Sequence, residues 1–207
     1  MHSEILSPKQ IELLPFIQKL SPEFYLAGGT AIALQIGHRS SIDFDLFSNT
    51  DIQPERMINN IYRLGYQIEH TFTQSGDEFT VMVNKVKITF LYYPFQIEPA
   101  VRFDSIIGMP DIQQLAAMKA YALGRRSKWK DYVDIYFLLK FHVVFKDVVE
   151  AAKNIYGRAF NERLFREQLC YFDDIDFSEH VAFNTNPAPD DETIRTFLTD
   201  IAILMPS

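Results

Sequence analysis

The order of strand-like and helix-like segments is the feature that most constrains this chain. Up to about residue 100, short apolar runs typical of strands are mixed with helical patterns. After Pro110 only helical patterns follow. This order predicts an α+β fold, in which residues 1–108 form a mixed sheet with flanking helices and residues 109–207 form a helical half.

In the first half we expect strands over residues 24–27, 42–47, 66–72, 78–83 and 85–92, and helices over residues 7–20, 30–36 and 54–64. The side chains expected to face inward from the first helix are Ile11, Leu14, Phe16 and Ile17. Thr30 is expected to cap the second helix and Gly37 to end it. Asn84-Lys85 is a plausible tight turn between the last two strands.

In the second half the expected helices cover residues 111–123, 130–142, 146–156, 161–169 and 192–205. Asp111 and Gln114 have the spacing of a capping box, and Gly124 is the expected stop of the helix that they begin.

Composition narrows the class of protein. The 207 residues are 47% apolar, which is enough for a sizeable core, and the net charge of −7 excludes a general positive field for polyanions. The single cysteine, Cys170, rules out an internal disulfide and fits a reducing compartment. We see neither a signal peptide nor a stretch of about 20 apolar residues that would cross a membrane. We therefore expect a cytoplasmic protein.

Gly28 and Gly29 follow the short apolar strand and precede a helix. The first N–H groups of a helix lack internal partners and carry the positive end of its dipole, and glycines allow a phosphate to approach them closely. The pair therefore indicates either a phosphate cradle that begins at Gly28, Gly29 and Thr30 or an ordinary tight turn.

Asp43 and Asp45 lie in the next strand, separated by one residue. Alternation turns Ile42, Phe44 and Leu46 to one face, into a core, and both carboxylates to the other face, about 7 Å apart along the strand. Two adjacent carboxylates favour a hard divalent cation such as Mg²⁺ or Mn²⁺. The alternative is the solvated face of an edge strand.

A cradle beside a carboxylate pair would suit the transfer of a nucleotidyl group, because a metal neutralises phosphate charge while the cradle holds the pyrophosphate. The residues just before the carboxylates could also contact phosphate or pair with the two acids; they are His38, Arg39 and Ser41.

At this point a family resemblance becomes specific. The segments LAGGTAIAL (residues 26–34) and GHRSSIDFDLF (residues 37–47) resemble the signature of AbiEii-type nucleotidyltransferase toxins, which belong to the polymerase-beta-like nucleotidyltransferase superfamily. A second block, Lys119 with KDYVDIY (residues 130–136), also resembles that family, so the resemblance covers most of the chain. It implies a nucleotidyltransferase-type sheet, metal binding by Asp43 and Asp45, a phosphate contact from Lys119 and a further acid at Asp131. It also implies an antitoxin partner.

Lys119 falls within the apolar stripe of its helix. It could snorkel, with its ammonium in water, or reach an anionic ligand in a cleft. Asp131 and Asp134 share one face of the next helix, which is apolar nearly all round, so both need partners. Asp131 could simply stabilise the helix start, and Asp134 is expected to pair with Arg125, Arg126, Lys119 or a metal.

A basic run with no acid inside it is the candidate contact for an RNA acceptor, or a solvated loop between helices; it consists of Lys119, Arg125, Arg126, Lys128 and Lys130. Elsewhere, Asp173, Asp174 and Asp176 are better explained as loop acids and caps than as a calcium-like site.

The sequence departs from the superfamily at Thr89, where a third carboxylate is expected on a later strand. Glu69, Glu98 or Asp131 could take its place. We therefore expect a metal-dependent nucleotidyltransferase that uses an NTP and an RNA or protein acceptor, with a catalytically weakened nucleotide-binding module as the alternative. A phosphohydrolase is disfavoured because no His/Asp cluster is available to activate water.

Overall fold

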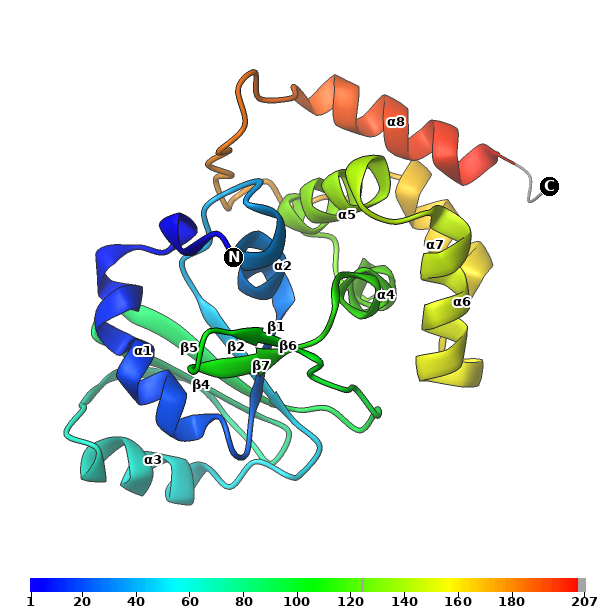
Figure 1. Cartoon of the computed structure of the whole chain (residues 1–207). Coiled ribbons are helices and arrows are strands. Elements are labelled where there is room, and N and C mark those ends of the chain that lie inside the picture. Colours follow the sequence, from blue (N-terminus) through cyan, green and yellow to red (C-terminus); the bar gives the residue numbers. More distant parts are fainter. Residues whose placement is uncertain (124, 205–207) are drawn as a thin grey trace. The chain divides into compact units, whose positions relative to one another are not determined.

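The computed structural model describes residues 1–123 and 125–204, so the helix stop predicted at Gly124 lies outside the described residues. The chain divides into two compact units, Met1–Asp111 and Ile112–Ser207. The strands of both sheets lie in the first unit, and the regular elements in the described part of the second are helices (Figure 1). The predicted α+β class is confirmed.

A short helical turn, η1 (Ser3–Ile5), leads into helix α1 (Pro8–Leu20). Ser7 caps α1 through a capping box, in which its Oγ accepts from the backbone N–H of Gln10 and the Gln10 side chain accepts from the Ser7 N–H. Phe16 and Ile17 are buried as predicted, but Ile11 is 51% exposed and Leu14 only half-buried. The buried stripe instead runs through residues 13, 16, 17 and 20, a helical spacing that places position 11 on the outer face.

The first unit is built on a five-stranded sheet in the order β1-β2-β5-β4-β3. Its strands are β1 (Tyr25–Ala27), β2 (Phe44–Ser48), β3 (Ile68–Gln74), β4 (Glu78–Val83) and β5 (Val86–Tyr92). Strands β2 and β5 pair in parallel and the other neighbours are antiparallel. The predicted turn between β4 and β5 is confirmed, because Asn84 and Lys85 have φ values of 50° and 62°, as a tight hairpin requires.

Period-two alternation gives the sheet one apolar face. Phe44 and Leu46 of β2 are buried together with Ile88 and Phe90 of β5 and their neighbours on β4. Helix α3 (Pro54–Arg63) adds Met57 and Ile61 to the core of this unit, and Figure 1 shows α1 and α3 beside the sheet. The expectation for Ile42 was wrong: it is 69% exposed, because β2 begins only at Phe44 and residue 42 precedes its regular alternation.

A second, two-stranded sheet was not predicted. It consists of β6 (Val101–Phe103) and β7 (Ile107–Met109), which pair in an antiparallel hairpin. Each strand has three residues, too few to establish an alternating pattern in the sequence.

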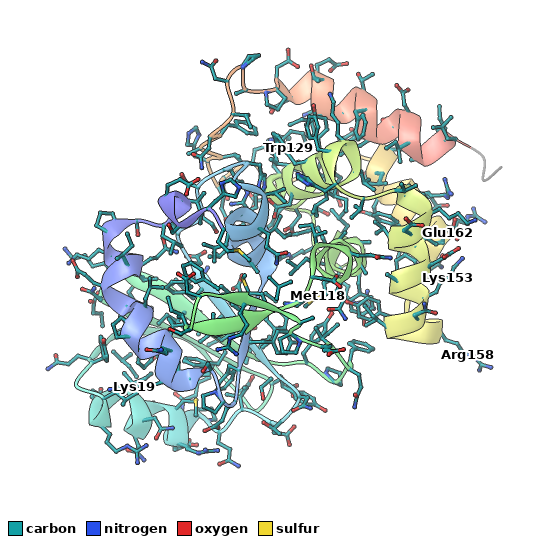
Figure 2. All side chains as sticks on the ribbon, in the orientation of Figure 1. Lys19, Met118, Trp129, Lys153, Arg158 and Glu162 are labelled. Carbon is teal, nitrogen blue, oxygen red and sulfur yellow. The ribbon has the colours of Figure 1, made fainter. Side chains whose placement is uncertain are left out.

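The second unit contains helices close to the predicted ranges: α4 (Ile112–Leu123), α5 (Trp129–Phe141), α6 (Phe145–Tyr156), the short turn η2 (Gly157–Ala159), α7 (Glu162–Cys170) and α8 (Asp191–Ile203). Lys153 of α6 and Glu162 of α7, both labelled in Figure 2, form an ion pair with Nζ 2.6 Å from Oε2. Among the described residues, no helix combines the length and apolarity needed to cross a membrane.

Candidate active site

Helix α2 (Gly28–Ile36) begins at the Gly-Gly turn and ends at Gly37, which has the expected left-handed φ of 69°. The predicted cap at Thr30 was wrong, because the helix already begins at Gly28 and Ala27 is its N-cap. Thr30 lies inside the first turn with its hydroxyl buried. That hydroxyl donates to the carbonyl of Asp43 at 2.5 Å and therefore accepts from Ser41 Oγ at 2.7 Å, because it has only one proton. These bonds fasten the segment before β2 to the helix start.

Asp45 lies against the start of α2. A Cβ placed on Gly28 would overlap Oδ2 of Asp45 and stand 3.2 Å from its Cγ. Gly28 also has a φ of 68°, which side chains disfavour. The glycine is thus required both by the backbone conformation and by the carboxylate beside it. The positive end of the helix dipole favours a negative charge at this point.

Asp43 lies just before β2, two residues from Asp45, and both aspartates are half-buried. Lys87 of β5 stands opposite Asp43 if the parallel register is extended by one residue, and its Nζ lies 3.5 Å from Asp43 Oδ2. A cation, here an ammonium group, already accompanies the carboxylate of Asp43. The pairing of Lys87 with Asp43 depends on the strand register, which spacing along the sequence does not reveal.

The donor set fits a divalent metal of the magnesium type. Such ions are commonly bound by one or two carboxylates, with water and substrate phosphates completing the shell. Asp43 and Asp45 could supply two carboxylates, and the described part of the chain contains no group of three acidic, His or Cys side chains arranged to hold a metal. Bound there, Mg²⁺ or Mn²⁺ would neutralise phosphate charge.

Thr89 is the direct partner of Asp45 in the parallel β2–β5 pair. On its other side Thr89 pairs with Thr80 of β4, and their hydroxyl oxygens are 3.4 Å apart. Thr80 also donates to the carboxylate of Glu78 at 2.7 Å. The position where the sequence lacks an acid is therefore beside Asp45. Glu69 instead accepts from the Lys85 N–H at 3.1 Å, and Glu98 is exposed.

The polar residues just before the aspartates are buried; they are His38, Arg39 and Ser41. Arg39 donates to the carbonyl of Ser40 at 3.0 Å, and Ser41 bonds Thr30. These contacts organise the connection between α2 and β2. Their predicted contact with phosphate stays a prediction.

Lys119 belongs to the second unit, where it lies between two carboxylates. Its Nζ is 2.6 Å from Asp131 Oδ1 and 2.9 Å from Asp134 Oδ2, and the side chain is only 4% exposed. Lys119 is one of the partners predicted for Asp134, and the structure shows this pair. The snorkelling alternative for Lys119 was wrong, because the side chain is buried. Burial lowers the pKa of Lys119, but the two aspartates outweigh this effect and the pKa is raised.

Asp131 has a second cationic partner in Arg126, whose Nε lies 2.8 Å from Oδ2. Burial raises the pKa of Asp131, but the charges of Lys119 and Arg126 outweigh it and the pKa is lowered. Lys119, Arg126, Asp131 and Asp134 thus form a compact ionic cluster, which we call the Lys119 cluster.

The rest of the predicted basic run is also engaged within the second unit. Lys128 and Lys130 both pair with Glu179, and the Arg125 guanidinium stacks 3.4 Å above the Tyr121 ring. The three acids of the 173–176 segment include Asp174, which accepts from Ser127, and Asp176, which accepts from the Ser178 N–H. These bonds support their interpretation as loop acids.

Residues 16–201 match the family described as Nucleotidyl transferase AbiEii toxin, Type IV TA system, which covers most of the chain. The chain belongs to the AbiEii nucleotidyltransferase toxin family. The predicted family is confirmed, and the Gly28–Asp45 region and the Lys119 cluster both lie within the match.

Three other proteins are similar to this AbiEii chain in sequence or in fold. An uncharacterised protein of Aquifex aeolicus is 30% identical over 160 residues, which are 73% of this chain and 75% of that protein. The MenT4 nucleotidyltransferase toxin of Mycobacterium tuberculosis shares the fold, with a TM-score of 0.61, 12% identity and coverage of 94% and 82% of the two chains. JHP933 of Helicobacter pylori also shares it, with a TM-score of 0.55, 19% identity and coverage of 95% and 91%.

Proposed function

We propose that this AbiEii chain is a metal-dependent nucleotidyltransferase that moves a nucleotidyl group from an NTP to a hydroxyl of an RNA or protein acceptor. The observation that supports the proposal is the contact of Asp45 with Gly28, which brings one of the two carboxylates against the N-terminus of α2. Family membership supports the same class of reaction.

In such a transfer, an acceptor oxygen forms a bond to the α-phosphorus of the NTP, the bond to pyrophosphate breaks, and the acceptor proton is released. The metal, when bound, would screen the phosphate charge. Asp43 and Asp45 would hold it through their carboxylates. The backbone N–H groups of Gly28, Gly29 and Thr30 at the start of α2 would bind phosphate oxygens.

We also propose a role for Lys87, as a cation that contacts the triphosphate, which the sequence alone did not suggest. In the structure its ammonium accompanies Asp43 at 3.5 Å. A divalent ion at the carboxylate pair would repel that ammonium. Lys87 would then be available for the negative charge of a triphosphate on the same face of the sheet.

The family resemblance gives Lys119 and Asp131 catalytic roles as a phosphate contact and an additional acid, and we keep both roles as part of the proposal. An anionic ligand at Lys119 would compete with two carboxylates already within 3 Å of its ammonium. The antitoxin partner and the RNA contact at the basic run are proposals of the same kind.

The test is incubation of the purified chain with each α-labelled NTP, Mg²⁺, and either total RNA or a protein extract. We expect label to enter one acceptor class and to be lost, by at least about 100-fold, in Asp43→Asn and Asp45→Asn. Asp51→Asn is the matched control, because Asp51 is an exposed aspartate of the same unit. Transfer that persists in both site variants would contradict the assignment.

A second candidate function is a nucleotide-binding module with little catalysis. It is favoured by one observation, the hydroxyl of Thr89 beside Asp45 where the superfamily expects an acid. Saturable NTP binding that depends on Asp43 and Asp45, without transfer to any acceptor, would identify it.

A further inference from the structure

We propose that Thr30 and Gln10 are positioning residues for the Asp43–Asp45 cation site, because both side chains hold the backbone of Asp43 through its carbonyl oxygen. The Thr30 hydroxyl then serves this anchor and does not contact phosphate. The inference rests on the proposed function, since it concerns the same carboxylate pair. It leaves the backbone N–H groups at the start of α2 as the phosphate contacts.

The two aspartates are held by different means. Asp45 lies within β2 and is paired in register with Ala27 of β1 on one side and Thr89 of β5 on the other. Asp43 precedes the strand, which begins at Phe44. The end of a strand is held by fewer pairings than its interior, so side chains that bond the backbone of Asp43 contribute more to its position.

The first anchor comes from helix α2. The Thr30 hydroxyl donates to the carbonyl oxygen of Asp43 at 2.5 Å and accepts from Ser41 Oγ at 2.7 Å. Thr30 is only 1% exposed. A hydroxyl has one proton, and the Asp43 carbonyl already accepts it. A phosphate oxygen would need that same proton, so the hydroxyl is committed to the anchor.

The second anchor comes from helix α1, where Gln10 is fully buried. The N–H of Ser7 lies 2.9 Å from Oε1 of Gln10, and the Ser7 hydroxyl lies 3.0 Å from it. A backbone N–H only donates, so the amide atom that faces Ser7 is the oxygen. The amide nitrogen turns to the carbonyl of Asp43 and donates to it at 3.5 Å. The capping box of α1 therefore also orients a donor toward the cation site.

The anchors relate both carboxylates to the same helix. Asp45 lies against Gly28 at the start of α2, and Thr30 in the first turn of that helix holds Asp43. Metal ligands bind best when their supporting contacts fix them in advance. Removal of such supporting partners typically lowers metal affinity by about 10- to 100-fold.

The experiment measures the binding of Mn²⁺ alone to the full chain, through the loss of the free-ion electron paramagnetic resonance signal, with circular dichroism to verify folding. We expect Thr30→Val to weaken binding by about 10-fold. Thr30→Ser keeps the hydroxyl and should bind like the wild type. Ser48→Ala is the matched control, because Ser48 is also buried and its hydroxyl bonds Thr50 at the other end of β2. It should lower stability and leave Mn²⁺ binding unchanged.

Gln10→Leu tests the anchor from a second element. Its bond to Asp43 is the longer one, so we expect a smaller loss of Mn²⁺ affinity, about 3-fold. Ser7→Ala is the control, because it weakens the cap of α1 while the Ser7 N–H still holds the Gln10 amide. If Thr30→Val does not fold, Gln10→Leu decides: binding equal to that of Ser7→Ala would overturn the inference.

Titration with Mn²⁺ alone also separates the anchor from a phosphate contact. An NTP titration at saturating Mn²⁺ is the second arm. If Thr30→Val binds Mn²⁺ like the wild type and loses affinity only for the NTP, its hydroxyl contacts phosphate and the inference is wrong.

Failure of the inference can be distinguished from failure of the proposed function. If Mn²⁺ binding is lost in Asp43→Asn and Asp45→Asn but unchanged in folded Thr30→Val and Gln10→Leu, the anchor is wrong and the carboxylate site stands. If the wild type binds no Mn²⁺, or if binding survives in the aspartate variants, the carboxylate site and this inference fall together.

Discussion

The carboxylate of Asp45 occupies the space in which a side chain on Gly28 would begin. Gly28→Ala should therefore meet two penalties, a left-handed φ of 68° and a collision with Oδ2. The backbone penalty alone is about 1–2 kcal/mol. We expect a larger loss of unfolding free energy than this, measured by urea denaturation, together with weaker Mn²⁺ binding as Asp45 is displaced.

Gly65→Ala is the matched control for this prediction. Gly65 has a φ of 87°, but a Cβ there would meet nothing within 4 Å. The control isolates the backbone penalty and should leave Mn²⁺ binding unchanged. Equal effects of the two substitutions would show that the Asp45 side chain moves aside without a loss of unfolding free energy.

Lys87→Met should increase the affinity for Mn²⁺ alone, because it removes the ammonium that accompanies Asp43 at 3.5 Å. Both side chains are partly exposed, so the pair contributes at most about 1 kcal/mol, which corresponds to an increase of roughly 2- to 5-fold. Titration with Mn²⁺ tests this, and Lys85→Met, at the exposed turn of the same hairpin, is the control. An unchanged or lower affinity would contradict competition between Lys87 and the metal.

Lys119→Met should strongly destabilise the second unit, because Asp131 and Asp134 would keep buried charges without their shared ammonium. Removal of one partner from a buried ion pair typically costs about 3–5 kcal/mol. Thermal and urea unfolding measure the loss. Lys153→Met is the control, since its pair with Glu162 is largely exposed and should contribute no more than about 1 kcal/mol.

The stability contributed by Asp131 should disappear in acid. Its pKa is lowered in the folded protein, despite burial, by Lys119 and Arg126. The contribution is therefore fully present above the unfolded-state pKa of about 3.9 and is lost as the pH falls through the lower folded value. We expect Asp131→Asn to be less stable than the wild type by about 3 kcal/mol at pH 7, with the difference shrinking below about pH 4. A difference that stays constant between pH 7 and pH 3 would show that ionisation of Asp131 does not contribute.

The strand and helix predictions succeeded where a single segment contains its own signal. Period-two alternation identified β4 and β5, and their turn was recognisable from Asn84-Lys85. Helix α5 was recognisable as buried because it is apolar nearly all round. The prediction missed the three-residue strands β6 and β7, although it found β1, which is equally short. It was also wrong at Ile42, because β2 begins two residues later than expected and Ile42 is exposed.

The sequence by itself determined the fold class, the family, the Gly-Gly turn and the one-residue spacing of Asp43 and Asp45. These are local patterns, readable because neighbours in sequence are neighbours in space. The tertiary structure decided which distant side chains meet: Asp45 with Gly28, Lys87 with Asp43, Thr80 with Glu78 and Thr89, and Lys119 with two aspartates. Strand order and register bring the first three sets together, and helix packing the fourth. The spacing of residues along the sequence reveals neither strand register nor helix packing, because pairing between segments depends on how the whole core is buried.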